Sequence, residues 1–153
     1  MTDPELIRSG LLRALPDLAR AGVTSVQDNT WIKRPIAVLR DLKERGELTC
    51  RFSCWPLGEV PFLGAWVSTA VFDHDWYHLG PRKYFIDGAF SSHTAWLAGE
   101  YSDEPGNYGS GRSAHEIAKK LLPNVRRRRQ TAHHAIGDQA IAEFCDALEQ
   151  LLK

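Results

Sequence analysis

Charge of one sign, long apolar runs and cysteines are all scarce in this chain of 153 residues. Lys and Arg number 19 and so do Asp and Glu, so no bulk attraction to nucleic acid or to an anionic membrane is expected. No apolar run approaches the about 20 residues that cross a bilayer. Three cysteines and a start unlike a signal peptide predict a reduced, cytoplasmic protein without nucleic-acid or membrane partners.

The composition is otherwise ordinary, and it allows one compact domain with a substantial core: 43% of residues are hydrophobic and 25% are charged. Cys50 and Cys54 are four residues apart, which places both on one face of a strand. A metal or redox pair is one interpretation, but small core side chains are the more common one. Cys145 falls on the apolar stripe of a C-terminal helix, where we expect it to pack.

Hydrophobic periodicity and breaker residues predict a helix first, and then strands that alternate with helices. The first helix is expected to be kinked or split at Pro16 and to end at Gly22. A capping box of Ser113 and Glu116 begins a later helix, which Pro123 should stop. Strands are predicted at residues 23–27, 48–55, 83–87 and 131–136, and helices after the first at 35–45, 113–122 and 138–152.

Two connections between these elements are long. Residues 60–72 suggest a loop and a helix, and on a helix His74 and His78 would lie one turn apart, where they could hold a metal. A solvated, aromatic-rich connection is the other interpretation. Residues 90–111 are polar and glycine-rich, which is typical of an ordered loop that covers a site.

The stretch QTAHHAIGDQAIA at residues 130–142 joins the last predicted strand to the last helix. Because side chains alternate across a strand, His133 and His134 would point to opposite faces, one into a site and the other into packing. Asp138 is placed to N-cap the helix. A pair of core histidines bonded to the backbone is an alternative of similar weight.

This order of elements predicts parallel strands joined through helices, either as a small doubly wound sheet or as part of a (βα) barrel. No glycine-rich phosphate loop follows the first strand, which disfavours a nucleotide-binding sheet. Asp28, Asp87, His134 and Asp138 fall at or just past the carboxyl ends of their strands, which share one rim. Carboxylates and imidazole at such a rim are typical metal ligands.

Five motifs in order cover nearly the whole chain: AGVTSVQD (21–28), LKERGELTCRF (42–52), KYFIDGAFSSHTA (83–95), YSDEPGNYG (101–109) and HAIGDQA (134–140). Together they resemble amidohydrolase family 3, and within it the YtcJ-like metal-dependent hydrolases. The resemblance implies an α/β fold, namely a partial (βα)8 TIM barrel of about strands 2–5 that forms one domain over residues 1–153. It also implies hydrolysis of amide-type C–N bonds in small molecules by metal-activated water.

The same resemblance assigns roles to individual residues. Lys83 matches the strand-four lysine that is carboxylated and bridges two divalent metals in related enzymes, and His134 matches the strand-five histidine ligand. We expect the metal to be zinc. Asp87 and Asp138 also match family positions, where we expect them to support the ligands or the backbone. His133 lies outside the HAIGD match and is expected to pack.

The chain also departs from the family pattern, because it contains no His-x-His pair and lacks the strand-six histidine and strand-eight aspartate. We therefore expect a truncated or partial chain that is inactive alone and can self-associate through exposed barrel edges. A non-catalytic binding or assembly module derived from the hydrolase scaffold is the alternative. Nucleic-acid binding through the arginines at 126–129 is disfavoured, because the net charge is +0 and no aromatic residues are interleaved with them. A solvated connection explains this run better.

Overall fold

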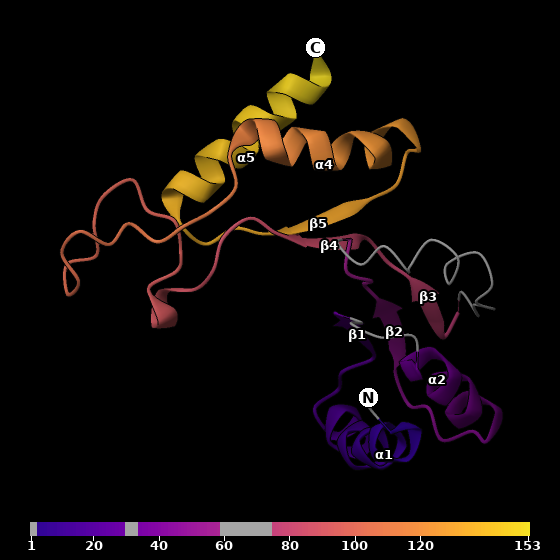
Figure 1. The fold of residues 1–153 in the computed structure, drawn as a ribbon. Helices are drawn as coiled ribbons and strands as arrows, with labels where there is room; N and C mark the ends of the chain where they lie inside the picture. The colour runs from indigo at the N-terminus through magenta and orange to yellow at the C-terminus, as the bar shows by residue number, and fades with distance from the viewer. Residues whose placement is uncertain (1–2, 30–33, 59–74) are drawn as a thin grey trace. The chain divides into compact units, whose positions relative to one another are not determined.

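The computed structural model describes residues 3–29, 34–58 and 75–153. The chain divides into two compact units, Met1–Pro81 and Arg82–Lys153 (Figure 1). Each unit is a parallel sheet with two helices packed on one of its faces. The predicted α/β class with parallel strands is therefore confirmed.

The first unit contains α1 (Pro4–Arg20), β1 (Ser25–Asp28), α2 (Arg34–Glu44), β2 (Arg51–Cys54) and β3 (Tyr77–Leu79). The strands are parallel in the order β1-β2-β3. Leu15 of α1 and Leu39 and Leu42 of α2 pack against Phe52 and Cys54 of β2, so the helices share one core with the sheet. Cys50, just before β2, is also buried in this core, so both Cys50 and Cys54 are packing residues, as one of the two interpretations expected.

Two possibilities that the sequence left open in this unit are excluded. Helix α1 is not split at Pro16, because it is a single helix that contains this proline, and Leu15 next to it is fully packed in the core. His78 lies on β3 rather than on a helix, and this three-residue strand was not predicted. Tyr77 buries its side chain there while β3 pairs with β2. His74 and the predicted helix at 60–72 lie outside the described residues.

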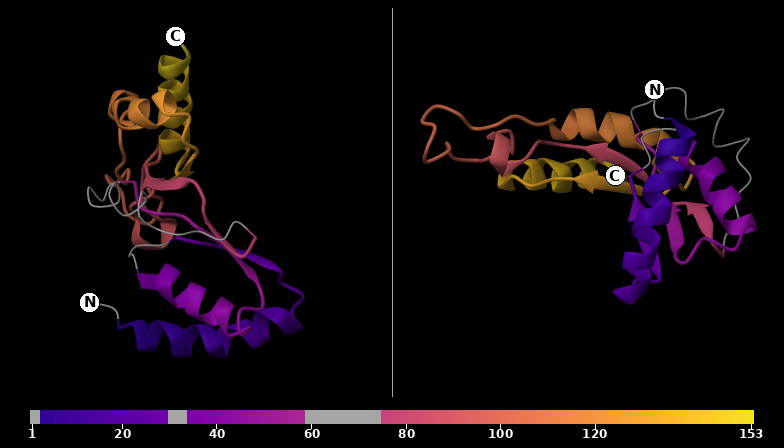
Figure 2. Two further views of the ribbon diagram at one scale, coloured as in Figure 1. Left: turned by 90° about the vertical axis from the view of Figure 1, so that its right-hand side faces the viewer. Right: turned by 90° about the horizontal axis from the view of Figure 1, so that it is seen from below.

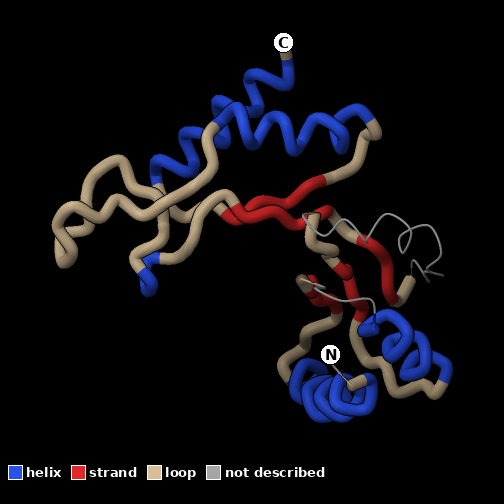
Figure 3. Tube along the Cα trace, viewed as in Figure 1, coloured by secondary structure: helices blue, strands red, loops and turns tan. Residues whose placement is uncertain are grey.

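The second unit contains β4 (Arg82–Phe85), the short 3-10 helix η1 (Phe90–Ser92), α4 (Ala114–Arg126), β5 (Thr131–His134) and α5 (Asp138–Leu152). Strands β4 and β5 are parallel neighbours. Helices α4 and α5 run side by side (Figure 2) and bury Tyr84 of β4 and Ile86, which follows this strand. The connection between β4 and α4 is almost entirely loop, as predicted for residues 90–111 (Figure 3).

Helix α4 begins where the sequence predicted but does not end there. Ser113 and Glu116 form the expected capping box. Pro123, however, lies inside the helix and does not stop it. The last turn is held by the next residue, Asn124, which is buried and donates a 2.8 Å hydrogen bond from Nδ2 to the hydroxyl of Tyr84. This tie to β4 offsets the backbone bond that the proline cannot make.

Helix α5 has the predicted limits, but two of its residues differ from expectation. Its N-cap is Gly137, so Asp138 is the first helical residue rather than the cap. Cys145 is exposed and does not pack in the core. Its side of the helix also carries Ile141 and Leu148, which are 47% and 40% exposed. The apolar stripe read from the sequence is therefore wider than the surface that α4 and β5 cover.

Candidate functional site

The register of β4 and β5 sorts their side chains onto two faces. Lys83 lies opposite Ala132, and Phe85 lies opposite His134. Since paired residues of parallel strands point the same way, Lys83, Phe85 and His134 share the face that α4 and α5 leave uncovered. His133 lies opposite Tyr84 on the helix-covered face. The sequence prediction that the two histidines point in opposite directions is confirmed.

His133 is a packing residue. Its ring stacks on Tyr84 with centroids 5.7 Å apart and lies 4.5 Å from the ring of Phe144. Its Nε2 is 2.9 Å from the hydroxyl of Thr131. Burial lowers the pKa of His133 to about 4, with a smaller contribution from the positive charge of Lys83. The imidazole is therefore neutral near pH 7 and fits an aromatic layer between sheet and helix.

His134 has one ring nitrogen fixed by the backbone. Its Nε2 is 2.7 Å from the carbonyl oxygen of Gly88. A carbonyl oxygen can only accept, so Nε2 must carry the proton, and Nδ1 of the neutral ring keeps its lone pair. The ring also contacts Phe85, with centroids 5.2 Å apart. A histidine held in this way presents Nδ1 as a donor atom for a metal.

Lys83 lies two residues before Phe85 on the same strand. Its Nζ is 5.3 Å from the centre of the Phe85 ring, within the range of a cation–π contact. Burial lowers the pKa of Lys83, because partial loss of water disfavours the charged form. The uncovered face thus presents an amine that gives up its proton more readily than an ordinary lysine, on the strand next to the imidazole.

Asp87 follows β4 and is almost completely buried. Its Oδ1 accepts from the backbone N–H of Ile136 at 3.0 Å, and its Oδ2 accepts from the N–H groups of Gly137 at 2.7 Å and Trp96 at 3.0 Å. Asp138 makes one such bond to this loop, because its Oδ1 accepts from the N–H of Ala98 at 3.0 Å. Both carboxylates therefore join the loop after β4 to the turn after β5.

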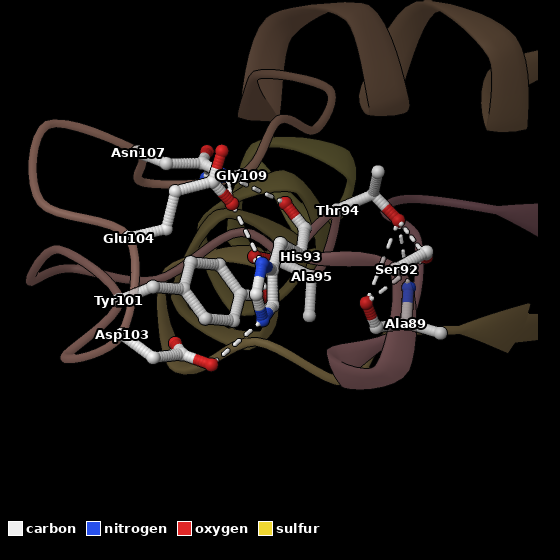
Figure 4. Close-up of polar contacts among 10 residues, drawn as sticks. All are labelled: Ala89, Ser92, His93, Thr94, Ala95, Tyr101, Asp103, Glu104, Asn107 and Gly109. Atoms are coloured by element: carbon white, nitrogen blue, oxygen red, sulfur yellow. Dashed lines mark hydrogen bonds and ion pairs between the residues drawn. The ribbon is translucent and has the colours of Figure 1, made fainter.

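A cluster around His93 fixes the tip of the same loop, and sequence reasoning did not single it out (Figure 4). Nδ1 of His93 is 2.6 Å from Glu104 and Nε2 is 3.1 Å from Asp103. Asn107 donates to Glu104 at 2.9 Å and to the His93 carbonyl at 3.1 Å. The bond from Asn107, and then that from His93, lower the pKa of Glu104. Only the motifs at 83–95 and 101–109 signalled that these two stretches belong together.

A cavity of about 380 Å³ opens beside this loop and the start of α5. Its walls are mainly apolar, with two carboxylates among them: Phe90, Leu97, Gly99, Glu100, Ile136, Asp138 and Ile141. The volume lies within the range of small-molecule pockets. All of its lining residues belong to the connections that follow β4 and β5, including Phe90 of η1, or to the first turns of α5.

The donor set on the uncovered face fits part of a metal site. Nδ1 of His134 and the amine of Lys83 are nitrogen donors of suitable chemistry. Among residues 3–29, 34–58 and 75–153, no group of three or more His, Cys, Asp or Glu side chains is placed to hold a metal.

Asp28, which the sequence placed at the same rim, ends β1 of the first unit. The arginines at 126–129 are exposed at the end of α4 and in the turn that follows.

The chain is similar to known proteins in sequence and in fold. A model of the family described as "Amidohydrolase family" matches residues 1–153. An uncharacterized metal-dependent hydrolase from Pyrococcus furiosus is similar in structure, with a TM-score of 0.82 and 23% identity over 99% of this chain and 33% of that one. A second such hydrolase, from Pyrococcus horikoshii OT3, has a TM-score of 0.81 and 25% identity over 97% of this chain and 31% of that one.

A curated relative is Protein LONG AFTER FAR-RED 3 of Arabidopsis thaliana, 35% identical over 78 residues, which are 50% of this chain and 13% of that protein. The chain therefore spans only a small part of the curated relative and about a third of each solved structure. Within the described part of the chain, no helix is both long enough and apolar enough to cross a membrane.

Proposed function

The chain belongs to the amidohydrolase family, and on that premise we propose that it forms part of a metal-dependent enzyme that hydrolyses amide-type C–N bonds in small molecules. Lys83 and His134 are the metal ligands that this chain contributes. The observation that carries the proposal is the fixed ring of His134, whose Nε2 donates to Gly88 and whose Nδ1 is left for a metal. Lys83 lies on the same uncovered face of the adjacent strand.

Lys83 serves as a ligand in its carboxylated form. The neutral amine attacks the carbon of carbon dioxide, a new N–C bond forms, and one proton is released to water, so the product is an anionic carbamate. The lowered pKa of Lys83 favours this step, because only the unprotonated amine has the lone pair that it needs. The charge changes from positive to negative, which turns a repelling side chain into an oxygen ligand for a cation.

A bound divalent metal, which we propose to be zinc, supplies Lewis acidity and a water of lowered pKa. The chain's own residues have other tasks. His134 must keep its ring direction, and the bond from its Nε2 to the Gly88 carbonyl fixes that direction. Asp87 holds the backbone on either side of the ligand strand ends. The apolar part of the substrate enters the cavity beside Phe90 and Ile136.

The finer assignments are part of the same proposal. The enzyme is of the YtcJ-like type, its residues 1–153 form one partial (βα)8 barrel, and it works in the cytoplasm without a nucleic-acid partner. Because the sequence contains no His-x-His pair, the chain alone holds too few ligands for turnover. Strand β5 pairs only with β4 among the described strands, and its other edge is where self-association would occur.

Metal analysis of the purified chain tests the ligand assignment. We expect Lys83→Ala and His134→Ala each to weaken zinc binding at least tenfold, as loss of a direct ligand should. His115→Ala and Lys119→Ala are matched controls, because both side chains are exposed on α4, and they should bind like the unmodified chain. Equal affinity in all five proteins would refute the assignment. ¹³C-labelled bicarbonate should give a carbamate signal that disappears in Lys83→Ala.

A second experiment separates the enzyme from a non-catalytic module. The chain alone should not hydrolyse amides at any zinc concentration, and metal-dependent turnover by the pure chain would contradict its proposed dependence on further polypeptide. The non-catalytic binding or assembly module predicts something different, namely a stable oligomer whose zinc content is the same in Lys83→Ala and His134→Ala. Size-exclusion chromatography with light scattering and metal content measured on the same fractions distinguish the two.

A further inference from the structure

One peptide group connects His134 to a side chain in the loop after β4. The carbonyl oxygen of the Gly88–Ala89 peptide accepts from Nε2 of His134 at 2.7 Å. The N–H of the same peptide, which belongs to Ala89, donates to Oγ1 of Thr94 at 3.1 Å. The peptide plane is thus bonded on both sides, to the ring of His134 through its oxygen and to the hydroxyl of Thr94 through its N–H.

Further bonds make this arrangement rigid. The N–H of Gly88 donates to the carbonyl of Thr94 at 3.1 Å, and the N–H of Thr94 donates to the carbonyl of Ala89 at 3.1 Å. The hydroxyl of Ser92 lies 2.7 Å from that of Thr94 (Figure 4). A Cβ built on Gly88 would lie only 1.9 Å from Oγ1 of Thr94. The hydroxyl therefore occupies the space that any side chain at residue 88 would need.

From this geometry we propose that Thr94 is a positioning residue for His134. By accepting the Ala89 N–H, its hydroxyl holds the Gly88 carbonyl in line with Nε2 and so selects the ring tautomer that leaves Nδ1 unprotonated. Hydrogen bonds in a chain polarise one another, so a bond at the N–H of a peptide strengthens the acceptor at its oxygen. The consequence for metal binding rests on the proposed function, whereas the effect on the tautomer does not.

A structural role alone would give a different result. Thr94 is exposed, so water can satisfy the Ala89 N–H when the hydroxyl is removed, and the loss of stability should be small. The three bonds of Asp87 hold the loop independently of Thr94. What water cannot supply is a fixed acceptor direction. The expected effect of removing the hydroxyl is therefore on the ring of His134 rather than on folding.

Nitrogen NMR of the metal-free chain tests this directly, at an alkaline pH at which imidazole is neutral. The ring signals of His134 are assigned by their loss in His134→Gln. In the unmodified chain, Nε2 should carry the proton and Nδ1 should show the shift of an unprotonated ring nitrogen. Thr94→Val, which keeps the shape and removes the hydroxyl, should shift the two signals towards each other as the second tautomer appears. Thr94→Ser should restore the original pattern.

Zinc titration of the same proteins adds a second readout. Thr94→Val should weaken binding about tenfold, which is the usual effect of removing a group that supports a metal ligand, and Thr94→Ser should stay within about twofold. If Thr94→Val does not fold, Thr94→Ala replaces it, because this smaller side chain cannot clash. A locked tautomer in a chain that binds no zinc would refute the proposed function and leave this inference standing.

Three results would overturn the inference. The first is a predominant Nδ1–H tautomer in the unmodified chain. The second is a Thr94→Val or Thr94→Ala spectrum in which the signals of His134 are unchanged. The third is a Thr94→Ser protein that behaves like Thr94→Val, since the methyl group and not the hydroxyl would then matter. In each case the amide signals of Trp96, Ile136 and Gly137 report whether the fold around Asp87 is intact.

Discussion

Replacing Asp87 by asparagine should destabilise the second unit strongly although the two side chains have almost the same shape. The carboxylate accepts three backbone N–H groups with two oxygens and is only 9% exposed. An amide has one oxygen. In its better orientation that oxygen replaces Oδ2 and keeps the bonds from Trp96 and Gly137, while the amide hydrogens face the N–H of Ile136.

The magnitude follows from these three contacts. Hydrogen bonds to a charged acceptor are worth about 1 kcal/mol more than neutral ones, and this difference is lost twice. The buried N–H of Ile136 loses its partner, which costs about 1–3 kcal/mol more. We therefore expect Asp87→Asn to lower the free energy of unfolding by about 4 kcal/mol, and Asp87→Ala by at least as much because all three N–H groups lose their acceptor.

Urea unfolding followed by circular dichroism measures the loss, and hydrogen exchange shows where it arises. The amides of Trp96, Ile136 and Gly137 should exchange on the order of a thousandfold faster if opening is easier by about 4 kcal/mol. Asp146→Asn is the matched control, because this carboxylate is exposed on α5, and its effect should stay within about 0.5 kcal/mol. A loss below about 1 kcal/mol in Asp87→Asn would refute the reasoning.

Three further predictions concern the same unit. His133 has a pKa of about 4 in the fold, below its ordinary 6.5, so its contribution to stability is complete above pH 6.5 and is lost as the pH falls towards 4. This contribution amounts to about 3 kcal/mol. The urea midpoint of His133→Phe should therefore depend less on pH than that of the unmodified chain. Tyr84→Phe leaves the buried amide of Asn124 without its acceptor and should cost about 1–3 kcal/mol in the same assay. Gly137→Ala would place a Cβ 1.8 Å from the carbonyl oxygen of Trp96, and thermal unfolding should show a loss of about 3 kcal/mol or no folded protein.

Much of the fold could be predicted because local patterns determine it. The limits of α5 follow from apolar residues at helical spacing, and the opposite directions of His133 and His134 follow from strand alternation. Strand β3 was not predictable in the same way, because three residues are too few to show a period. Pro123 misled the prediction of the end of α4, because the bond that holds that turn comes from a tyrosine 40 positions away in the sequence.

In the candidate site, too, some residues could be predicted from the sequence and others could not. The resemblance of short motifs placed Lys83 and His134, and the register of two strands put them on one face. The tie from Asp87 to Trp96, Ile136 and Gly137 could not be read in advance, because all three partners are backbone groups that any sequence would offer. The role of Thr94 could not be predicted for a similar reason. Its partner is the peptide N–H of Ala89, which carries no signal in the sequence.

The peptide between Gly88 and Ala89 gives the protein a built-in reporter. Its N–H lies one amide plane away from the ring of His134, so any change in how strongly Nε2 donates alters the electron density at that proton. The backbone signal of Ala89 should therefore record events at Nδ1 without a label on the histidine and without any contact with the incoming ligand. The signal of that single amide could therefore be used to follow the binding, competition and release of a ligand at Nδ1 in an otherwise unmodified chain.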